Sequence, residues 1–168
     1  MAPPGRPEPD GEDSLTQIIA GVVDVYVIRP YLDAWRVLAV QRGLDTRCPT
    51  AWETVHGRVE PGERPEEAAV REVREETGLA IDRLYNVTVQ PFYLHTTGTV
   101  QLAVVFAAFV REPAEVTLGP EHQSHEWLSV AAAAERFVWP REREALQHIQ
   151  ILLAGGDAGP VEDVLRVV

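Results

Sequence analysis

Residues 52–79 read WETVHGRVEPGERPEEAAVREVREETGL, and this stretch decides the fold. Pro65 suits the first position of a helix, where its missing N–H would have no partner anyway. Gly78 suits the left-handed residue that commonly ends a helix. Between them, Ala69 and Val73 are four residues apart and give a small apolar face. The stretch therefore predicts a short strand, a loop and a helix that packs on a β-sheet.

The predicted helix concentrates carboxylates near its end. Glu72, Glu75 and Glu76 are helical neighbours, and like charges at such spacing destabilise a helix by roughly 0.2–0.5 kcal/mol per pair. The helix dipole also disfavours anions near the C-terminus. One interpretation is a solvated charged helix, which most Glu- and Arg-rich stretches form. The other is a site for a hard divalent cation, Mg²⁺ or Mn²⁺, which prefers oxygen ligands.

The loop before the helix has features that would hold it in place. Pro61 and Gly62 suit a type II turn, which needs φ > 0 at its third residue. Glu63 precedes Arg71 in the sequence, and an ion pair between them would bridge the loop and the helix.

The same stretch matches a known pattern. The nine specified positions of G-x5-E-x7-R-E-U-x-E-E-x-G-U, with U aliphatic, are Gly57, Glu63, Arg71, Glu72, Val73, Glu75, Glu76, Gly78 and Leu79. The stretch resembles the signature of the Nudix hydrolases. The resemblance implies an α/β/α sandwich and cleavage of a pyrophosphate linkage with the help of divalent cations.

The resemblance also implies roles for individual residues. The cation ligands would be Glu72, Glu75, Glu76 and the carbonyl of Gly57. Glu63 and Arg71 would form the structural ion pair, which places Arg71 in the catalytic set. His56 departs from many relatives, which carry glycine there, and a bulkier residue would reshape the edge of the pocket or contact substrate.

A second segment, PEHQSHEWLSVAAAAERF (120–137), adds to the expected site. Some Nudix enzymes take a further carboxylate six residues before a tryptophan, and Glu121 has this spacing to Trp127. We therefore expect Glu121 to be a metal ligand or the base, with Glu72 as the other candidate base; a solvated loop glutamate is the alternative. His122 and His125 lack the further ligands that a closed zinc site needs.

Outside the helix, the pattern predicts a sheet with a second helical layer. Strands are expected at 17–28, 35–42, 51–57, 84–95, 99–110 and 125–130, and helices at 129–137 and 139–155. This order of strands and helices is typical of an α+β fold, an α/β/α sandwich with a mixed sheet. We expect a disordered leader at 1–14, a Nudix domain at 15–155 and a tail at 156–168 that docks, pairs with a partner or hangs free.

Composition excludes several classes of function. The net charge of −11 argues against broad binding to nucleic acid or anionic membranes. All fifteen bases are arginine, which excludes a lysine nucleophile, Schiff base or P-loop. No apolar run approaches the ~20 residues of a membrane span. The single cysteine, Cys48, cannot form an internal disulfide and fits a cytoplasmic location.

These features predict a cytoplasmic, Mg²⁺-dependent hydrolase of a small nucleotide-like phosphate compound. Residues 52–79 and 120–137 are similar to the bacterial dATP and dihydroneopterin triphosphate pyrophosphohydrolase group, which favours a triphosphate substrate. The alternatives are a dinucleoside polyphosphate or ADP-sugar hydrolase, and a non-catalytic Nudix ligand-binding module. Arg42 and Arg58 are candidates to clamp substrate phosphates. Relatives commonly dimerise, so the resemblance also allows a homodimer.

Overall fold

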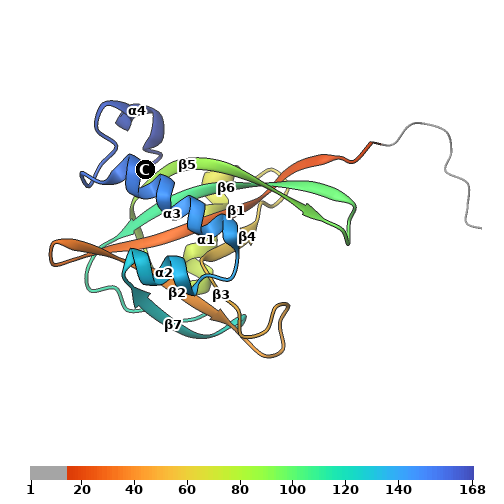
Figure 1. Cartoon of the computed structure of the whole chain (residues 1–168), viewed down its shortest axis with the longest axis horizontal. Coiled ribbons are helices and arrows are strands. Elements are labelled where there is room, and N and C mark those ends of the chain that lie inside the picture. The colour runs from red at the N-terminus through yellow and green to blue at the C-terminus, as the bar shows by residue number, and fades with distance from the viewer. Residues whose placement is uncertain (1–14) are drawn as a thin grey trace, which may run out of the picture.

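Two apolar strands form the middle of a mixed β-sheet. In the computed structural model, which describes residues 15–168, β1 (Ile18–Tyr31) and β6 (Thr99–Val110) pair in parallel (Figure 1). Residues 22–28 of β1 and most of β6 are buried on both faces, which explains why these stretches are mainly apolar, with Asp24 and Gln101 as buried polar exceptions. The remaining strands pair antiparallel, and the main path of the sheet runs β3-β2-β1-β6-β5.

The other elements follow the predicted order. Strands β2 (Ala34–Arg42), β5 (Ile81–Leu94) and β7 (His122–Leu128) and helices α1 (Pro65–Thr77), α2 (Val130–Arg136) and α3 (Pro140–Leu153) agree with the expected segments to within a few residues. The predicted strand at 51–57 is instead two strands, β3 (Trp52–Glu53) and β4 (Val55–Arg58). They separate because β3 pairs with β2 while β4 pairs with β1. Thr54 between them donates its hydroxyl to the Val25 carbonyl of β1 and its N–H to the Glu142 carboxylate of α3.

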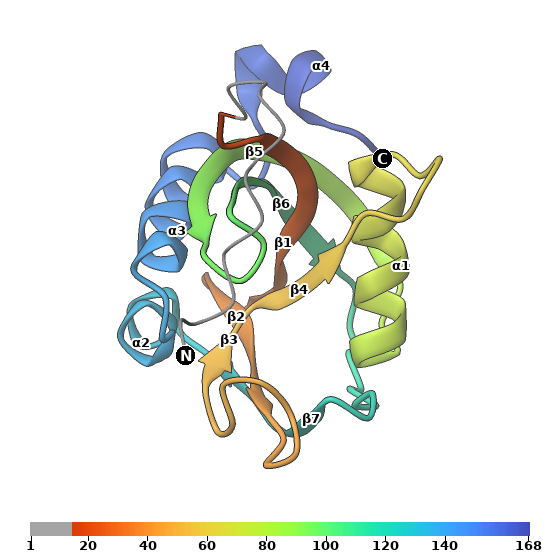
Figure 2. The same cartoon turned by 90° about the vertical axis from the view of Figure 1, so that its right-hand side faces the viewer.

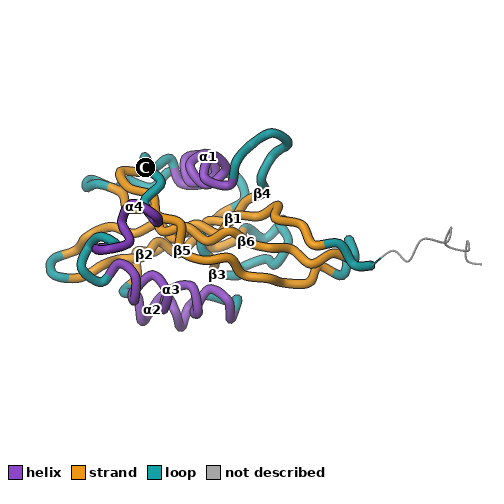
Figure 3. Tube along the Cα trace, turned by 90° about the horizontal axis from the view of Figure 1, so that it is seen from above, coloured by secondary structure: helices purple, strands orange, loops and turns teal. Residues whose placement is uncertain are grey.

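The sheet lies between two helical layers. α1 covers one face, and α2 and α3 cover the other (Figures 2 and 3). Alternate residues of β1 supply the two cores: Val23 and Val25 pack beneath α1, whereas Tyr26 and Ile28 pack beneath α3. The prediction of an α+β fold with an α/β/α arrangement and a mixed sheet is confirmed.

Local signals set the ends of α1. Pro65 is at its start, and the Glu67 side chain accepts a hydrogen bond from the Arg64 N–H. Gly78 ends the helix with φ +71° and donates its N–H to the Arg74 carbonyl. The small residues of its inner face, Ala68 and Ala69, are fully buried, which lets the helix backbone approach the sheet closely.

The C-terminal tail docks on the sheet. After η1 (Gly159–Val161) and α4 (Glu162–Leu165), the last residues lie beside β5, where Val167 donates its N–H to the Leu84 carbonyl. The Tyr85 hydroxyl adds a hydrogen bond to Glu162 at 3.0 Å. Of the three expectations for residues 156–168, docking is therefore what the structure shows. The predicted leader, residues 1–14, lies outside the described residues. Residues 15–168 contain no helix long and apolar enough to cross a bilayer.

Candidate active site

Arg71, in the middle of α1, binds the loop between β4 and α1 (residues 59–64, the approach loop) to the helix. Its Nε and Nη2 atoms donate to the two carboxylate oxygens of Glu63 at 2.8 and 2.9 Å, and Nη2 also donates to the Arg58 carbonyl at 2.8 Å. These hydrogen bonds from Arg71 lower the pKa of Glu63 to about 2. A planar guanidinium can make all of these bonds at once, which an ammonium group cannot. The predicted ion-pair residues thus lie in direct contact.

Gly57 leaves room for the carboxylate of Glu72. A Cβ atom at Gly57 would lie 2.1 Å from Cδ of Glu72, so any larger residue would occupy the same space as that carboxyl group. Oε1 of Glu72 accepts a hydrogen bond from Arg71 Nη1 at 2.7 Å. Burial raises the pKa of Glu72 above its ordinary value, although Arg71 opposes the shift. The structure therefore brings a backbone segment of β4 against the first expected ligand on α1.

The other two helix glutamates lie at different depths. Glu76 is only 8% exposed, and burial together with the charges of Glu72 and Glu53 raises its pKa to about 9. Its Oε2 atom is buried and makes no hydrogen bond to the described residues. The Glu75 side chain is 60% exposed and lies 3.3 Å from Arg71. Within residues 15–168, no group of three or more acidic, histidine or cysteine side chains is already arranged to hold a metal ion.

The loop before β7 is bonded to the end of α1. The last carbonyls of a helix lack partners within it, and here the N–H groups of Gly119 and Thr117 donate to the carbonyls of Glu76 and Thr77 at 2.9 Å. Gly119 can approach this closely because a Cβ there would lie 2.9 Å from the Glu75 carbonyl oxygen. Glu121, two residues later, is thereby brought to the same end of the sheet as the helix glutamates.

Arg42 at the end of β2 joins this part of the site. Its guanidinium lies 3.0 Å from Glu53 and 3.5 Å from Glu121. Glu121 is largely exposed, whereas Glu53 is buried. Burial alone would raise the pKa of Glu53, but His122 and Arg42 beside it bring that pKa below its ordinary value.

Sequence reasoning missed Glu53 and the buried position of His122. The His122 ring lies between two carboxylates, with Nε2 3.9 Å from Glu53 and Nδ1 4.0 Å from Glu76. The place of His122 could have been predicted: Glu121 was expected beside the glutamates of α1, and His122 is the next residue in the chain. The position of Glu53 carried no comparable signal.

His56 and Arg58 lie on the opposite face of β4 from Gly57. Successive strand residues point to opposite faces, and His56 bonds through Nδ1 to Asp24 at 2.5 Å. Asp24 is fully buried and also accepts from Arg141 of α3 at 3.1 Å. Burial alone would raise the pKa of Asp24, but His56 and Arg141 bring it below its ordinary value. Of the three residues predicted to contact substrate, His56 thus lies on the α3 side of the sheet and Arg58 shares its strand face, whereas Arg42 lies beside Glu121.

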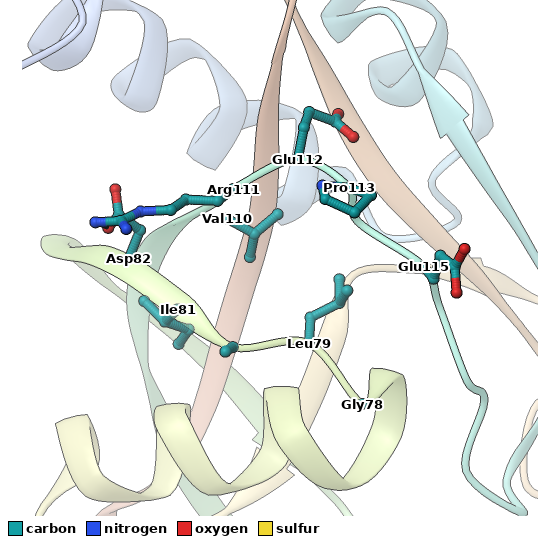
Figure 4. A pocket seen from close by; sticks show the side chains of 10 residues that line it. Gly78, Leu79, Ile81, Asp82, Val110, Arg111, Glu112, Pro113 and Glu115 are labelled. Atoms are coloured by element: carbon teal, nitrogen blue, oxygen red, sulfur yellow. Dashed lines mark ion pairs between the residues drawn. The ribbon is translucent and has the colours of Figure 1, made fainter.

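A separate surface cavity of about 550 Å³ lies beyond the C-terminal end of α1. Figure 4 shows it between the segment after Gly78 and the segment after Val110, with the Asp82 and Arg111 ion pair at its rim. The residues that line it include none of the α1 glutamates. This cavity is therefore distinct from the candidate site.

Comparison with known families agrees with the geometry. A NUDIX domain model matches residues 20–149, which include every residue of the candidate site described above. The chain belongs to the Nudix family. Helix α1 with its approach loop is accordingly the Nudix loop–helix–loop of this chain.

The relatives of this Nudix chain are named as proteins of different kinds. It is 38% identical to an octanoyltransferase of Myxococcus xanthus over 57% of this chain, and 28% identical to a putative nudix hydrolase of Caenorhabditis elegans over 93%. It spans only 28% and 40% of the length of those two proteins. An asymmetrical bis(5'-nucleosyl)-tetraphosphatase of Mus musculus is 29% identical over 57% of this chain and 67% of its own.

Solved structures share the Nudix fold. The Escherichia coli dihydroneopterin triphosphate pyrophosphohydrolase superposes with a TM-score of 0.63 at 24% identity, over 82% of this chain and 99% of that one. A C. elegans Ap4A hydrolase gives a TM-score of 0.66 at 23% identity, over 80% and 97%. These likenesses establish the fold.

Proposed function

We propose that this Nudix chain is a Mg²⁺- or Mn²⁺-dependent pyrophosphohydrolase. Its substrate would be a nucleoside triphosphate or another compound linked through a nucleoside diphosphate, cleaved by attack of water at phosphorus. The similarity of residues 52–79 and 120–137 to the dATP and dihydroneopterin triphosphate pyrophosphohydrolase group favours a triphosphate and release of pyrophosphate.

The proposal rests on one observation about two neighbouring carboxylates of α1. Glu76 has a buried oxygen without a hydrogen-bond partner, and the Glu72 carboxyl group occupies the space that Gly57 leaves free. Oε2 of Glu76 makes no hydrogen bond to the described residues, and Gly57 has no Cβ where the Glu72 carboxyl group lies. Buried carboxylates are normally paired, hydrogen-bonded or bound to a metal. Burial and neighbouring charges disfavour the ionised form of Glu76, and a divalent cation would reverse that preference. The donor set therefore fits Mg²⁺ or Mn²⁺.

The residues of the candidate site have two proposed roles, to bind the cation and to accept a proton. We assign the cation to Glu72, Glu75, Glu76, Glu121 and the Gly57 carbonyl. When bound, the cation neutralises phosphate charge and lowers the pKa of a water molecule. Glu72 and Glu121 are the two candidates to accept the proton of that water.

The arginines keep these groups in place. Arg71 fixes the loop that presents Gly57, through its bonds to Glu63 and the Arg58 carbonyl. Arg42 brings positive charge to the edge of the site between Glu53 and Glu121. His56 and Arg58 would contact the part of the substrate that reaches the α3 side of β4.

A second candidate is hydrolysis of dinucleoside polyphosphates. The 29% identity to an asymmetrical bis(5'-nucleosyl)-tetraphosphatase favours it over the remaining alternatives. A non-catalytic binding module is disfavoured, because every glutamate of the Nudix signature is present.

A panel of nucleotides with Mg²⁺ tests the proposal. We expect pyrophosphate from a triphosphate, and loss of that product in Glu76→Gln but not in Glu144→Gln, a control on the exposed face of α3. Mononucleotides from dinucleoside polyphosphates would instead favour the second candidate. No turnover of any pyrophosphate compound by the folded protein would contradict both.

A further inference from the structure

Two buried polar atoms beneath α1 face each other without a hydrogen-bond partner. Nδ1 of His122 and Oε2 of Glu76 lie 4.0 Å apart, and neither bonds to any described residue. The His122 side chain is 1% exposed and the Glu76 side chain 11%. Leaving buried polar atoms unpaired is unfavourable, so these two atoms are expected to share a partner.

The other nitrogen of His122 indicates which tautomer the ring adopts. Nε2 lies 3.9 Å from Oε1 of Glu53, and Arg42 holds that carboxylate at 3.0 Å. A proton on Nε2 would be directed at Glu53, which leaves the lone pair of Nδ1 directed at Glu76. Histidines that bind metals are commonly oriented in this way, with a carboxylate on the other ring nitrogen.

The gap between the two atoms has the size of a bound cation. A lone pair and a carboxylate oxygen repel each other unless something positive lies between them. Bonds from a first-row divalent metal to imidazole nitrogen and carboxylate oxygen are about 2.0–2.2 Å, so two of them in line span about 4.2 Å. The 4.0 Å between Nδ1 and Oε2 is close to that span.

We propose that His122 is a ligand, through Nδ1, of the cation that Glu76 holds, and that Glu53 is the positioning residue for the imidazole. The proposal rests on the proposed function, because it takes Glu76 as a cation ligand. It adds a nitrogen donor to a set of oxygens.

The nitrogen donor changes which cation the site prefers. Mg²⁺ favours oxygen ligands in near-ideal octahedral geometry, whereas imidazole favours transition metals. A mixed set of carboxylates and one imidazole therefore binds Mn²⁺ more tightly than Mg²⁺.

Pulsed electron paramagnetic resonance of the full chain loaded with Mn²⁺ tests the assignment. The expected spectrum shows modulation from a directly bonded ¹⁴N nucleus, which changes to the ¹⁵N pattern when histidine is ¹⁵N-labelled. His122→Asn removes the modulation and weakens Mn²⁺ binding by about tenfold or more, with a smaller effect on Mg²⁺. His125→Asn, on the same strand, serves as the matched control and keeps both properties.

The possible outcomes separate this proposal from the proposed function. Mn²⁺ that binds to the wild-type protein, is lost in Glu76→Gln and shows no nitrogen coupling would overturn the His122 assignment. In that case, Mg²⁺-dependent pyrophosphate release would leave the proposed function standing. Absence of any Mn²⁺ binding would overturn both. The isotope experiment uses the wild-type chain, so it remains decisive if His122→Asn fails to fold.

Discussion

The contact between Gly57 and Glu72 predicts a variant that folds but loses activity. In Gly57→Ala the new Cβ would lie 2.1 Å from the Glu72 carboxyl carbon, whereas ordinary contact begins at about 3.4 Å. The carboxyl group must therefore move by more than 1 Å. A misplacement of about 1 Å can cost ~10²-fold in rate, which corresponds to ~2.7 kcal/mol of transition-state stabilisation.

The cost to stability should be small by comparison. The φ of Gly57 is not in the left-handed region, so alanine introduces no backbone strain, and the Glu72 side chain can rotate away. The pair lost is the partly exposed contact between Arg71 and Glu72, worth roughly 0.2–1 kcal/mol. The melting temperature should fall by no more than about 4 °C.

Steady-state kinetics, Mg²⁺ titration calorimetry and thermal melting measure the three quantities. We expect kcat/KM and Mg²⁺ affinity to fall in Gly57→Ala while the melting temperature stays near that of the wild type. Gly155→Ala is the control, since a Cβ there meets nothing within 4 Å. Wild-type turnover and Mg²⁺ affinity in Gly57→Ala would refute the reasoning.

Three further predictions concern side chains that stabilise the fold. The pKa of buried Glu142 is raised to about 8 by burial and nearby charge, so ionising it costs up to about 5 kcal/mol. The contribution of Glu142 to the free energy of unfolding therefore falls as the pH rises from 5 to 8. Denaturant titrations across this pH range should show that Glu142→Gln lacks this part of the wild-type pH dependence. Arg71→Lys cannot make the two-pronged bond to Glu63, so urea unfolding should show a loss of about 1–2 kcal/mol; an unchanged midpoint would contradict this. Tyr85→Phe removes the bond to Glu162, and hydrogen exchange should quicken over residues 162–168 while the rest of the sheet keeps its protection.

The sequence predicted those elements whose structure depends on residues close together in the chain. Pro65 and Gly78 gave the ends of α1, and the nearly continuous apolar run at 99–110 gave a central strand. The pattern could not show that Thr54 separates two strands, because that break depends on pairing with β1 and β2, which are remote in sequence.

The candidate site was predictable only in part for the same reason. The signature placed Glu72 and Glu76 on one helix, but the ion-pair partner of buried Glu53 is Arg42, which comes from another strand. The direction of His56 depends on Asp24, which lies 32 residues earlier in the chain. Such long-range partners leave no periodic trace in a single sequence.

The docked tail has a consequence for how this protein meets copies of itself. β5 is the outer strand of the sheet, and an open outer strand offers free N–H and C=O groups to which another chain can add. The Leu84 end of that edge is already occupied by Val167 and Val168, and Pro91 further along has no N–H to offer. Edge-to-edge growth of the sheet into ordered aggregates is thereby hindered along this side, without the lysines that many proteins place on such edges.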